Sequence, residues 1–157
     1  MIKLTKSQQL LYQIIKSKGE LEDKTKLVKL QYFADFIHYA FNNQPISQTS
    51  IVYTREKQGL LSRNFNSDLA VLKEEGLISE SPKYHFRVKK EIETEFNKKE
   101  IKTIDFVLKK YGDVPYSDLV SICHSQIPYL STTVGGVAEF FTAYNLVDEY
   151  SDYASFN

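Results

Sequence analysis

The segment that most constrains the fold is residues 61–88, LSRNFNSDLAVLKEEGLISESPKYHFRV. Its apolar residues recur at the spacing of one helical face: Phe65, Leu69 and Leu72. Ser62 is of the residue type that caps a helix N-terminus, and Gly76 is of the type that ends a helix in the left-handed conformation. The pattern therefore predicts one amphipathic helix between these two residues.

Two short strands are expected after this helix. The first begins at residues 77–78, and aromatic and β-branched side chains alternate along residues 84–88 in the second. Residues 81–83, Ser-Pro-Lys, supply the turn between them. A helix followed by a hairpin is the second half of a winged helix. The sequence thus predicts a mainly α fold with a small β-hairpin, a winged-helix-like helical domain.

Capping and periodicity predict the remaining elements. Capping-box pairs start two helices, Thr5 with Gln8 before residues 6–18, and Asn97 with Glu100 before a helix that ends at Gly112. The segment 24–41 is apolar on most faces, which is typical of a central helix surrounded by other elements. We also expect the following elements: a strand over 50–53, a charged connector or helical extension over 89–99, a short helix over 116–124, a last helix capped by Thr133, and a strand-like or frayed end over 150–157.

Charge is distributed unevenly along a chain whose formal net charge is zero. Residues 1–90 hold 15 Lys/Arg against 9 Asp/Glu, a formal charge of +6. Residues 91–157 hold 5 against 11, a formal charge of −6. This predicts a winged-helix domain with a basic surface over 1–90 and an acidic helical extension over 91–157, although the halves could also neutralise each other within the fold. A weak internal echo makes the extension a candidate degenerate second winged helix.

No membrane association is expected. Apolar runs in the chain fall short of the roughly 18–20 residues that a membrane span needs. The first residues, MIKLTKSQQ, lack the apolar stretch of a signal peptide. The single cysteine, Cys123, has no partner for an internal disulfide. We therefore expect a cytoplasmic protein.

Catalytic and metal-binding chemistry is sparse. One cysteine and three scattered histidines, His38, His85 and His124, do not supply a metal-ligand set. Neighbouring residues on a helix point about 100° apart, so Cys123 and His124 are expected to be a core residue and a helix cap. Gly135-Gly136 lacks the lysine of a phosphate-binding loop. We expect no enzymatic activity, no catalytic residues, no metal and no small-molecule cofactor.

Three segments resemble the Panacea domain of SocA-like antitoxins. They are KTKLVKLQYFADFIHYA at 24–40, SDLAVLKEEGLI at 67–78, and IDFVLKKYGDVPYSDLVSICHSQIPYL at 104–130, with a polar turn containing Gly59 between the first two. The first ninety residues also resemble an uncharacterised winged-helix family. The resemblance implies a helical domain that binds a protein partner, often a toxin, sometimes fused to a DNA-binding segment. It implies no catalytic residues.

Double-stranded DNA is the first partner that the residues suggest. Polar and basic side chains of the kind that contact bases and phosphates lie on the helix, beside it and on the hairpin. The candidate DNA-binding residues are Arg55, Lys57, Arg63, Asn64, Asn66, Lys73, Lys83 and Arg87. Each can equally be an ordinary charged or polar surface residue, and Glu74 and Glu75 oppose the approach of phosphate.

A protein-interaction module is the alternative. The chain has 11 Tyr and 10 Phe, more aromatic residues than one small core comfortably buries. The C-terminal aromatic set could form a partner or self-association surface, or could close the core: Tyr129, Phe140, Phe141, Tyr144, Tyr150 and Tyr153. The main hypothesis is a DNA-binding winged-helix regulator that acts as a dimer. The alternative is an antitoxin-like or adaptor module without DNA binding.

Overall fold

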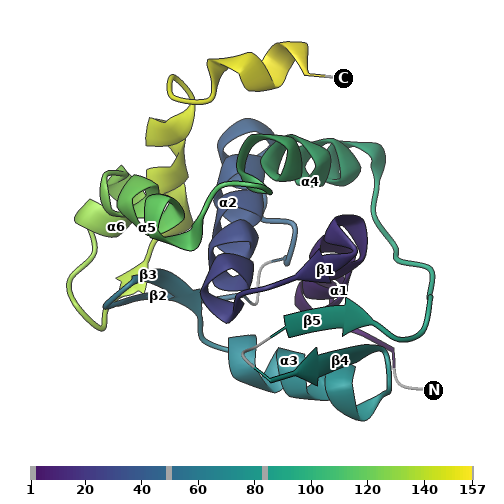
Figure 1. The fold of residues 1–157 in the computed structure, drawn as a ribbon. Coiled ribbons are helices and arrows are strands. Elements are labelled where there is room, and N and C mark those ends of the chain that lie inside the picture. The colour runs from purple at the N-terminus through teal and green to yellow at the C-terminus, as the bar shows by residue number, and fades with distance from the viewer. Residues whose placement is uncertain (1–2, 49–50, 83–84, 157) are drawn as a thin grey trace.

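The computed structural model describes residues 3–48, 51–82 and 85–156. The chain is mainly helical with two small antiparallel sheets, as expected in outline (Figure 1). Its first part contains α1 (Lys6–Lys18), β1 (Glu20–Leu21), α2 (Lys24–Asn42), β2 (Tyr53–Glu56), β3 (Gly59–Ser62), α3 (Phe65–Glu74), β4 (Ile78–Ser81) and β5 (His85–Val88). Its second part contains α4 (Lys98–Tyr111), α5 (Tyr116–His124), α6 (Ile127–Leu130), β6 (Val137–Ala138), and the 3-10 helices η1 (Phe140–Leu146) and η2 (Ser151–Ser155).

Both predicted capping boxes are confirmed. The Thr5 hydroxyl accepts a hydrogen bond from the Gln8 amide at 3.2 Å, and the Gln8 side chain accepts one from the Thr5 amide at 2.9 Å. Asn97 and Glu100 exchange the equivalent bonds at 2.8 Å and 2.9 Å. Because each box satisfies backbone donors that the first helical turn leaves open, these residues fix where α1 and α4 begin.

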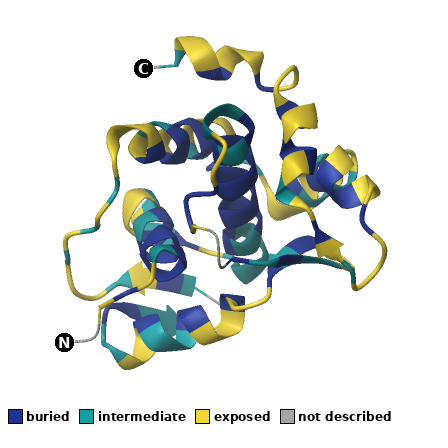
Figure 2. Cartoon of the chain, turned by 180° about the vertical axis from the view of Figure 1, so that it is seen from behind, coloured by how far each residue is buried: buried dark blue, intermediate teal, exposed yellow. Residues whose placement is uncertain are grey.

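Helix α2 is the core element of the chain, as its nearly all-round apolar pattern predicts. Its aromatic residues Tyr32, Phe33 and Phe36 have no exposed surface. The helix packs against α1 and α4 and also against α5 and η1 (Figures 1 and 2). The basic and the acidic part of the chain thus share α2 as a common support, and the proposed division at residue 90 stays a prediction.

The β4–β5 hairpin expected after α3 is present. Antiparallel pairing joins Ser79 to Arg87 and Glu80 to Phe86. Strand β1 extends this sheet by pairing with β5, so that the strand order is β1-β5-β4. A two-residue strand carries too little pattern to be predicted from sequence. The residues at 83 and 84, in the expected turn and second strand, lie outside the described residues.

Helix α3 begins later than the sequence suggested. The proposed N-cap, Ser62, ends strand β3, and Asn64 occupies the N-cap position. The Ser62 side chain instead accepts a hydrogen bond from the Asn64 amide at 3.3 Å, as Ser residues do in turns. The predicted inner face is correct, since Phe65, Leu69 and Leu72 are buried.

The end of α3 is also as predicted. Gly76 has φ +72°, and the amide of Leu77 donates to the Leu72 carbonyl at 3.0 Å. A left-handed glycine with this long return bond is the usual way in which a helix stops and reverses direction. The chain then enters β4 at once.

The polar segment before α3 forms a hairpin that was not expected. Strands β2 and β3 pair antiparallel from Tyr53–Ser62 to Glu56–Gly59. The sequence prediction placed one strand at 50–53, of which position 50 lies outside the described residues, and it placed a turn and a helix start where β3 lies. Strand β6 from the C-terminal part then pairs with β2, which gives the order β3-β2-β6.

The predictions for the C-terminal segment named the wrong types of secondary structure. Thr133 does not cap a helix, because Val137 lies in β6 and the following residues form the 3-10 helix η1. The end of the chain is neither strand-like nor frayed, since η2 places Tyr153 in the core with 5% exposure. Residues 137–155 are shaped by tertiary contacts, which local periodicity does not encode.

The charged connector before α4 is extended and lies along α1. The Tyr12 hydroxyl donates to the Lys90 carbonyl at 2.8 Å and accepts from the Ile92 amide at 3.0 Å. Further along, the Gln9 side chain accepts from the Glu95 amide at 2.7 Å. These bonds replace the strand partner that an extended segment would otherwise need. None of the described helices is both long enough and apolar enough to cross a bilayer.

Candidate interaction surfaces

The candidate DNA-binding residues separate into two groups. Arg63, Asn64 and Asn66 are exposed together where the chain enters α3. Lys57 is exposed in the turn between β2 and β3 and lines the same pocket as Asn66. These four are available to an outside ligand.

Three other basic candidates are engaged within the chain. Lys73 forms an ion pair with Glu80 at 2.7 Å, and Arg87 forms one with Glu20 at 3.1 Å. His85 contacts the same Glu20 oxygen at 3.1 Å. The guanidinium of Arg55 donates to the Thr132 carbonyl at 2.7 Å. The position of Lys83 lies outside the described residues.

Arg55 also links β2 to the C-terminal part of the chain. Its guanidinium carbon lies 4.1 Å from the ring centroid of Tyr129, a cation–π geometry. His124 stacks on the same Tyr129 ring with 4.3 Å between centroids. Burial and the nearby cations Lys29 and Arg55 lower the pKa of His124. Cys123 is fully buried, as expected of a core residue.

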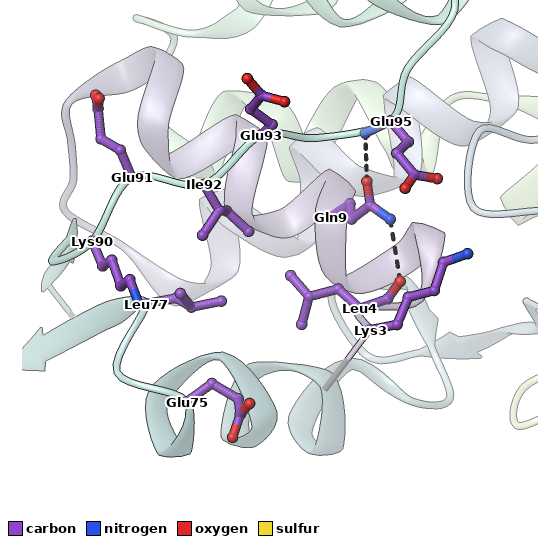
Figure 3. A pocket seen from close by; sticks show the side chains of 10 residues that line it. All are labelled: Lys3, Leu4, Gln9, Glu75, Leu77, Lys90, Glu91, Ile92, Glu93 and Glu95. Atoms are coloured by element: carbon purple, nitrogen blue, oxygen red, sulfur yellow. Dashed lines mark hydrogen bonds between the residues drawn. The ribbon is translucent and has the colours of Figure 1, made fainter. Parts of the chain in front are cut away.

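A groove of about 450 Å³ lies between α1, the end of α3 and the extended connector (Figure 3). Its apolar lining comes from Leu4, Leu77 and Ile92, and carboxylates of four glutamates lie around it: Glu75, Glu91, Glu93 and Glu95. Lys3 and Lys90 also line it. The groove itself has no sequence signal, because hydrogen bonds from α1 side chains create it.

The C-terminal aromatic set divides between core and surface. Tyr129, Tyr150 and Tyr153 are buried, whereas Phe141 is 61% and Tyr144 is 47% exposed. Phe140 is intermediate and stacks on Phe36 with 4.7 Å between centroids. The buried members therefore close the core, as one alternative predicted, whereas a partner surface formed by the exposed members stays a prediction.

Exposed large apolar side chains concentrate in the C-terminal part of the chain. Seven of the nine among the described residues fall between 127 and 147, and we call these seven the C-terminal apolar face: Ile127, Leu130, Val134, Val137, Phe141, Tyr144 and Val147. They come from α6, β6, η1 and adjoining turns, and α6 packs against η1. Figure 2 shows exposed residues along the outer side of this segment.

The C-terminal apolar face is anchored on both sides. The Tyr144 hydroxyl donates to Asn43 Oδ1 at 2.7 Å, and the Tyr144 ring lies 5.5 Å from that of Tyr39. A shallow pocket of about 330 Å³ lies beside it, lined by Tyr39, Phe140 and Phe141 among others. Strand β6 ties the same segment to β2. The apolar side chains are thus held on an ordered support.

A buried hydrogen-bonded chain links α6 and the C-terminal tail to α2 and α4. The Tyr32 hydroxyl donates to Gln126 Oε1 at 2.7 Å, and Gln126 Nε2 donates to the Tyr150 hydroxyl at 2.7 Å. The hydroxyls of Tyr111 and Tyr150 are 2.7 Å apart. Burial raises the pKa of Tyr111 to about 12. These phenols stay neutral, so this series of hydrogen bonds joins the elements without a buried charge.

Two buried titratable groups on α2 face opposite parts of the chain. Asp35 accepts from the Tyr53 hydroxyl at 2.6 Å on the β2 side, and burial raises its pKa to about 6. His38 Nδ1 lies 2.7 Å from the Thr103 hydroxyl on the α4 side, and burial lowers its pKa to about 4. Within the described ranges, no cluster of three or more His, Cys, Asp or Glu residues is arranged to hold a metal ion.

Comparison with known families identifies the chain. The family model for the antitoxin SocA-like, Panacea domain matches residues 27–128, which is more than half of the chain. The chain therefore belongs to the antitoxin SocA-like, Panacea domain family. The match extends from the first turn of α2 to the start of α6, so most of the C-terminal apolar face follows it. No curated protein and no solved structure matches the chain.

Proposed function

We propose that this chain is an antitoxin-like protein that binds a protein partner through the C-terminal apolar face, without catalytic activity or a small-molecule cofactor. Membership of the SocA-like antitoxin family supports a toxin as the partner. The observation that carries the choice of surface is that seven of the nine exposed large apolar side chains in the described part of the chain fall between residues 127 and 147.

Apolar exposure of this kind is a binding signal because it has a cost in the free chain. Side chains such as Leu130 and Phe141, 54% and 61% exposed, gain free energy only when another surface removes them from water. Large aromatic and aliphatic anchors at the centre of an interface contribute most of its affinity. The ordered support beneath them also reduces the entropy lost on binding.

The test begins with partner capture. The full chain, immobilised through a terminal tag, is incubated with a lysate of its own source, and the retained protein is identified and purified. Its Kd is then measured by calorimetry for the wild type and for the double variant Leu130→Ser with Phe141→Ser. We expect at least about a 30-fold weaker Kd, because truncating an interface anchor costs about 2 kcal/mol or more.

The matched control is Ile101→Ser on α4, where the side chain is 47% exposed and lies outside the C-terminal apolar face. It should leave the Kd unchanged. Equal Kd values for wild type and double variant would exclude this face as the binding surface. Sedimentation velocity on the chain alone tests self-association, and loss of a dimer in the double variant would make a second copy the partner.

A second candidate function is DNA binding by a winged-helix regulator. It is favoured by the order α1-β1-α2-α3-β4-β5, which the β2–β3 hairpin interrupts between α2 and α3, and by the sheet order β1-β5-β4. The exposure of Arg63, Asn64 and Asn66 beside the first turn of α3 also favours it. The ion pairs of Lys73 and Arg87 weaken it, because cations that are already paired bind phosphate less readily. In this second candidate function the regulator would act as a dimer.

Fluorescence anisotropy with a labelled duplex at low salt tests this second candidate. Affinity should fall steeply as salt rises, because each phosphate contact releases counterions. The double variant Arg63→Ala with Asn66→Ala should weaken it, whereas the control Lys16→Ala on α1 should not. An unchanged anisotropy at low salt would remove DNA binding from consideration.

A further inference from the structure

A further pocket lies between the start of α2, the β2–β3 turn and the start of α3, and the DNA-binding candidates Lys57 and Asn66 line part of it. Its volume is about 430 Å³. Three lysines line it, Lys24, Lys29 and Lys57, against one carboxylate, Glu56. That carboxylate accepts a hydrogen bond from the Thr54 hydroxyl at 3.0 Å. The charged lining is therefore predominantly positive.

Lys29 is the unusual member of this lining, because it is only 2% exposed. Its ammonium lies against the backbone of Gly59, where a Cβ would collide with Nζ and would lie 3.0 Å from the Cys123 sulfur. Gly59 has φ +131°, so the backbone there leaves the space that the ammonium fills.

The ammonium of Lys29 has no counter-charge in the described part of the chain. No described carboxylate forms an ion pair with it, and no described acceptor forms a hydrogen bond with it. Burial raises the pKa of the neighbouring Cys123 thiol, which therefore stays neutral near pH 7. An isolated buried ammonium is costly, and the cost is removed when an anion binds beside it.

The start of α3, where Phe65 and Asn66 line the same pocket, also has open hydrogen-bond donors. Asn64 makes no side-chain capping bond, and the first amide in the helix with a backbone partner is that of Asp68, which donates to the Asn64 carbonyl at 2.8 Å. The amides of residues 65–67 are left without a partner among the described residues. Open amides at a helix N-terminus favour an anion.

We propose that this pocket binds the phosphate group of a small organic molecule, with the Lys29 ammonium as counter-ion and the first turn of α3 as the amide donor. The pocket is larger than a bare phosphate requires, and Val28, Leu61 and Phe65 give it apolar walls for an organic body. Lys24 and Lys57 add charge at the same site. This proposal is independent of the proposed function, because it uses none of the residues of the C-terminal apolar face.

Thermal unfolding of the full chain with two phosphate probes and two controls tests the proposal. Inorganic phosphate and adenosine monophosphate should each raise the Tm by about 2–4 °C once they are several-fold above their Kd, whereas adenosine and chloride at equal ionic strength should not. A larger effect of the nucleotide would place the organic body in the pocket, and equal effects would mean that phosphate alone is bound. No shift with either phosphate probe would overturn the proposal.

The variant Lys29→Met separates ligand binding from a structural role. It keeps the aliphatic stem, so it should raise the Tm of the free chain, while the response to phosphate is lost. The control Lys16→Met, at an exposed lysine of α1, should change neither value. A lower Tm together with an unchanged phosphate response would show that Lys29 only packs the core, and would contradict the proposal.

A second variant tests the helix start without touching the core. Asn66→Glu places a carboxylate in the first turn of α3, where a negative charge favours the helix. It should leave the Tm of the free chain unchanged or slightly higher and abolish the phosphate response, while Asn66→Gln should retain that response. An intact response in Asn66→Glu would exclude the first turn of α3 as the anion site.

Discussion

The surface around α3 and the C-terminal apolar face differ in how many of their potential binding groups are already engaged by other residues of the chain. Around α3, Lys73 and Arg87 are paired with Glu80 and Glu20, whereas Lys57 and the residues at the helix start remain exposed. On the C-terminal apolar face, Phe141 and its neighbours stay exposed on a support fixed by hydrogen bonds. A charge seen in a sequence is therefore not an available charge until its neighbours are known. Exposed apolar surface has no such internal partner.

The largest expected effect separates core from interface within the C-terminal segment. Leu146 is 1% exposed, so Leu146→Ala should lower the free energy of unfolding by about 2–5 kcal/mol, because it removes buried methyl groups and leaves a cavity. The neighbouring exposed residue provides the control, and Phe141→Ala should change stability by no more than about 0.5 kcal/mol. Urea denaturation measures both. A large loss in Phe141→Ala would mean that its ring is part of the core.

The next effect concerns the contact between α2 and α4. Since the pKa of His38 is lowered from 6.5 to about 4 in the folded chain, the unfolded chain binds more protons in that interval. Stability from this group is complete above pH 6.5 and is lost as the pH falls toward 4, by up to about 3 kcal/mol. His38→Gln should abolish this dependence in urea titrations. An identical pH profile in that variant would contradict the assignment.

Asp35, on the other side of α2, should act in the opposite direction. Its pKa is raised from 3.8 to about 6, so the folded chain binds more protons in that interval. The group therefore costs stability as the pH rises from 3.8 to 6, by about 2–3 kcal/mol. Asp35→Asn should make the chain gain more stability between pH 4 and 6 than the wild type does. A smaller gain would show that Asp35 is ionised in the fold through this whole range.

The smallest effect tests the paired charges beside α3. Lys73 and Glu80 form a partly exposed ion pair, so Glu80→Gln should destabilise the chain by no more than about 0.5 kcal/mol, and the change should vanish at high salt. The same variant releases Lys73 and should strengthen any binding of duplex at low salt several-fold. Unchanged anisotropy in Glu80→Gln would show that Lys73 is not part of a DNA-binding surface.

The parts of the fold that could be predicted are those determined by residue type and spacing within a short segment. Two capping boxes, the left-handed Gly76, and the inner face of α3 all follow from spacing and residue type. The parts that were wrong depend on distant partners. Ser62 has the chemistry of a helix cap, yet its backbone pairs with Tyr53 in a hairpin.

The candidate sites follow the same division. Exposure of the residues at the start of α3 was predictable from the helical face. The pairing of Arg87 with Glu20 was not, because these two residues of β5 and β1 are 67 positions apart in the sequence. Likewise, the sequence alone does not distinguish whether an apolar residue near position 140 lies in the core or on the surface. Only the packing of η1 against α2 decides that Phe140 stacks inward while Phe141 is exposed.

Hydrogen–deuterium exchange on the purified complex with its captured partner locates the binding surface. Partner binding should protect amides in residues 127–147, with little change in residues 63–74, which comprise α3 and the two residues before it. Protection confined to residues 63–74, with an unchanged C-terminal apolar face, would contradict this prediction and would move the binding surface to α3.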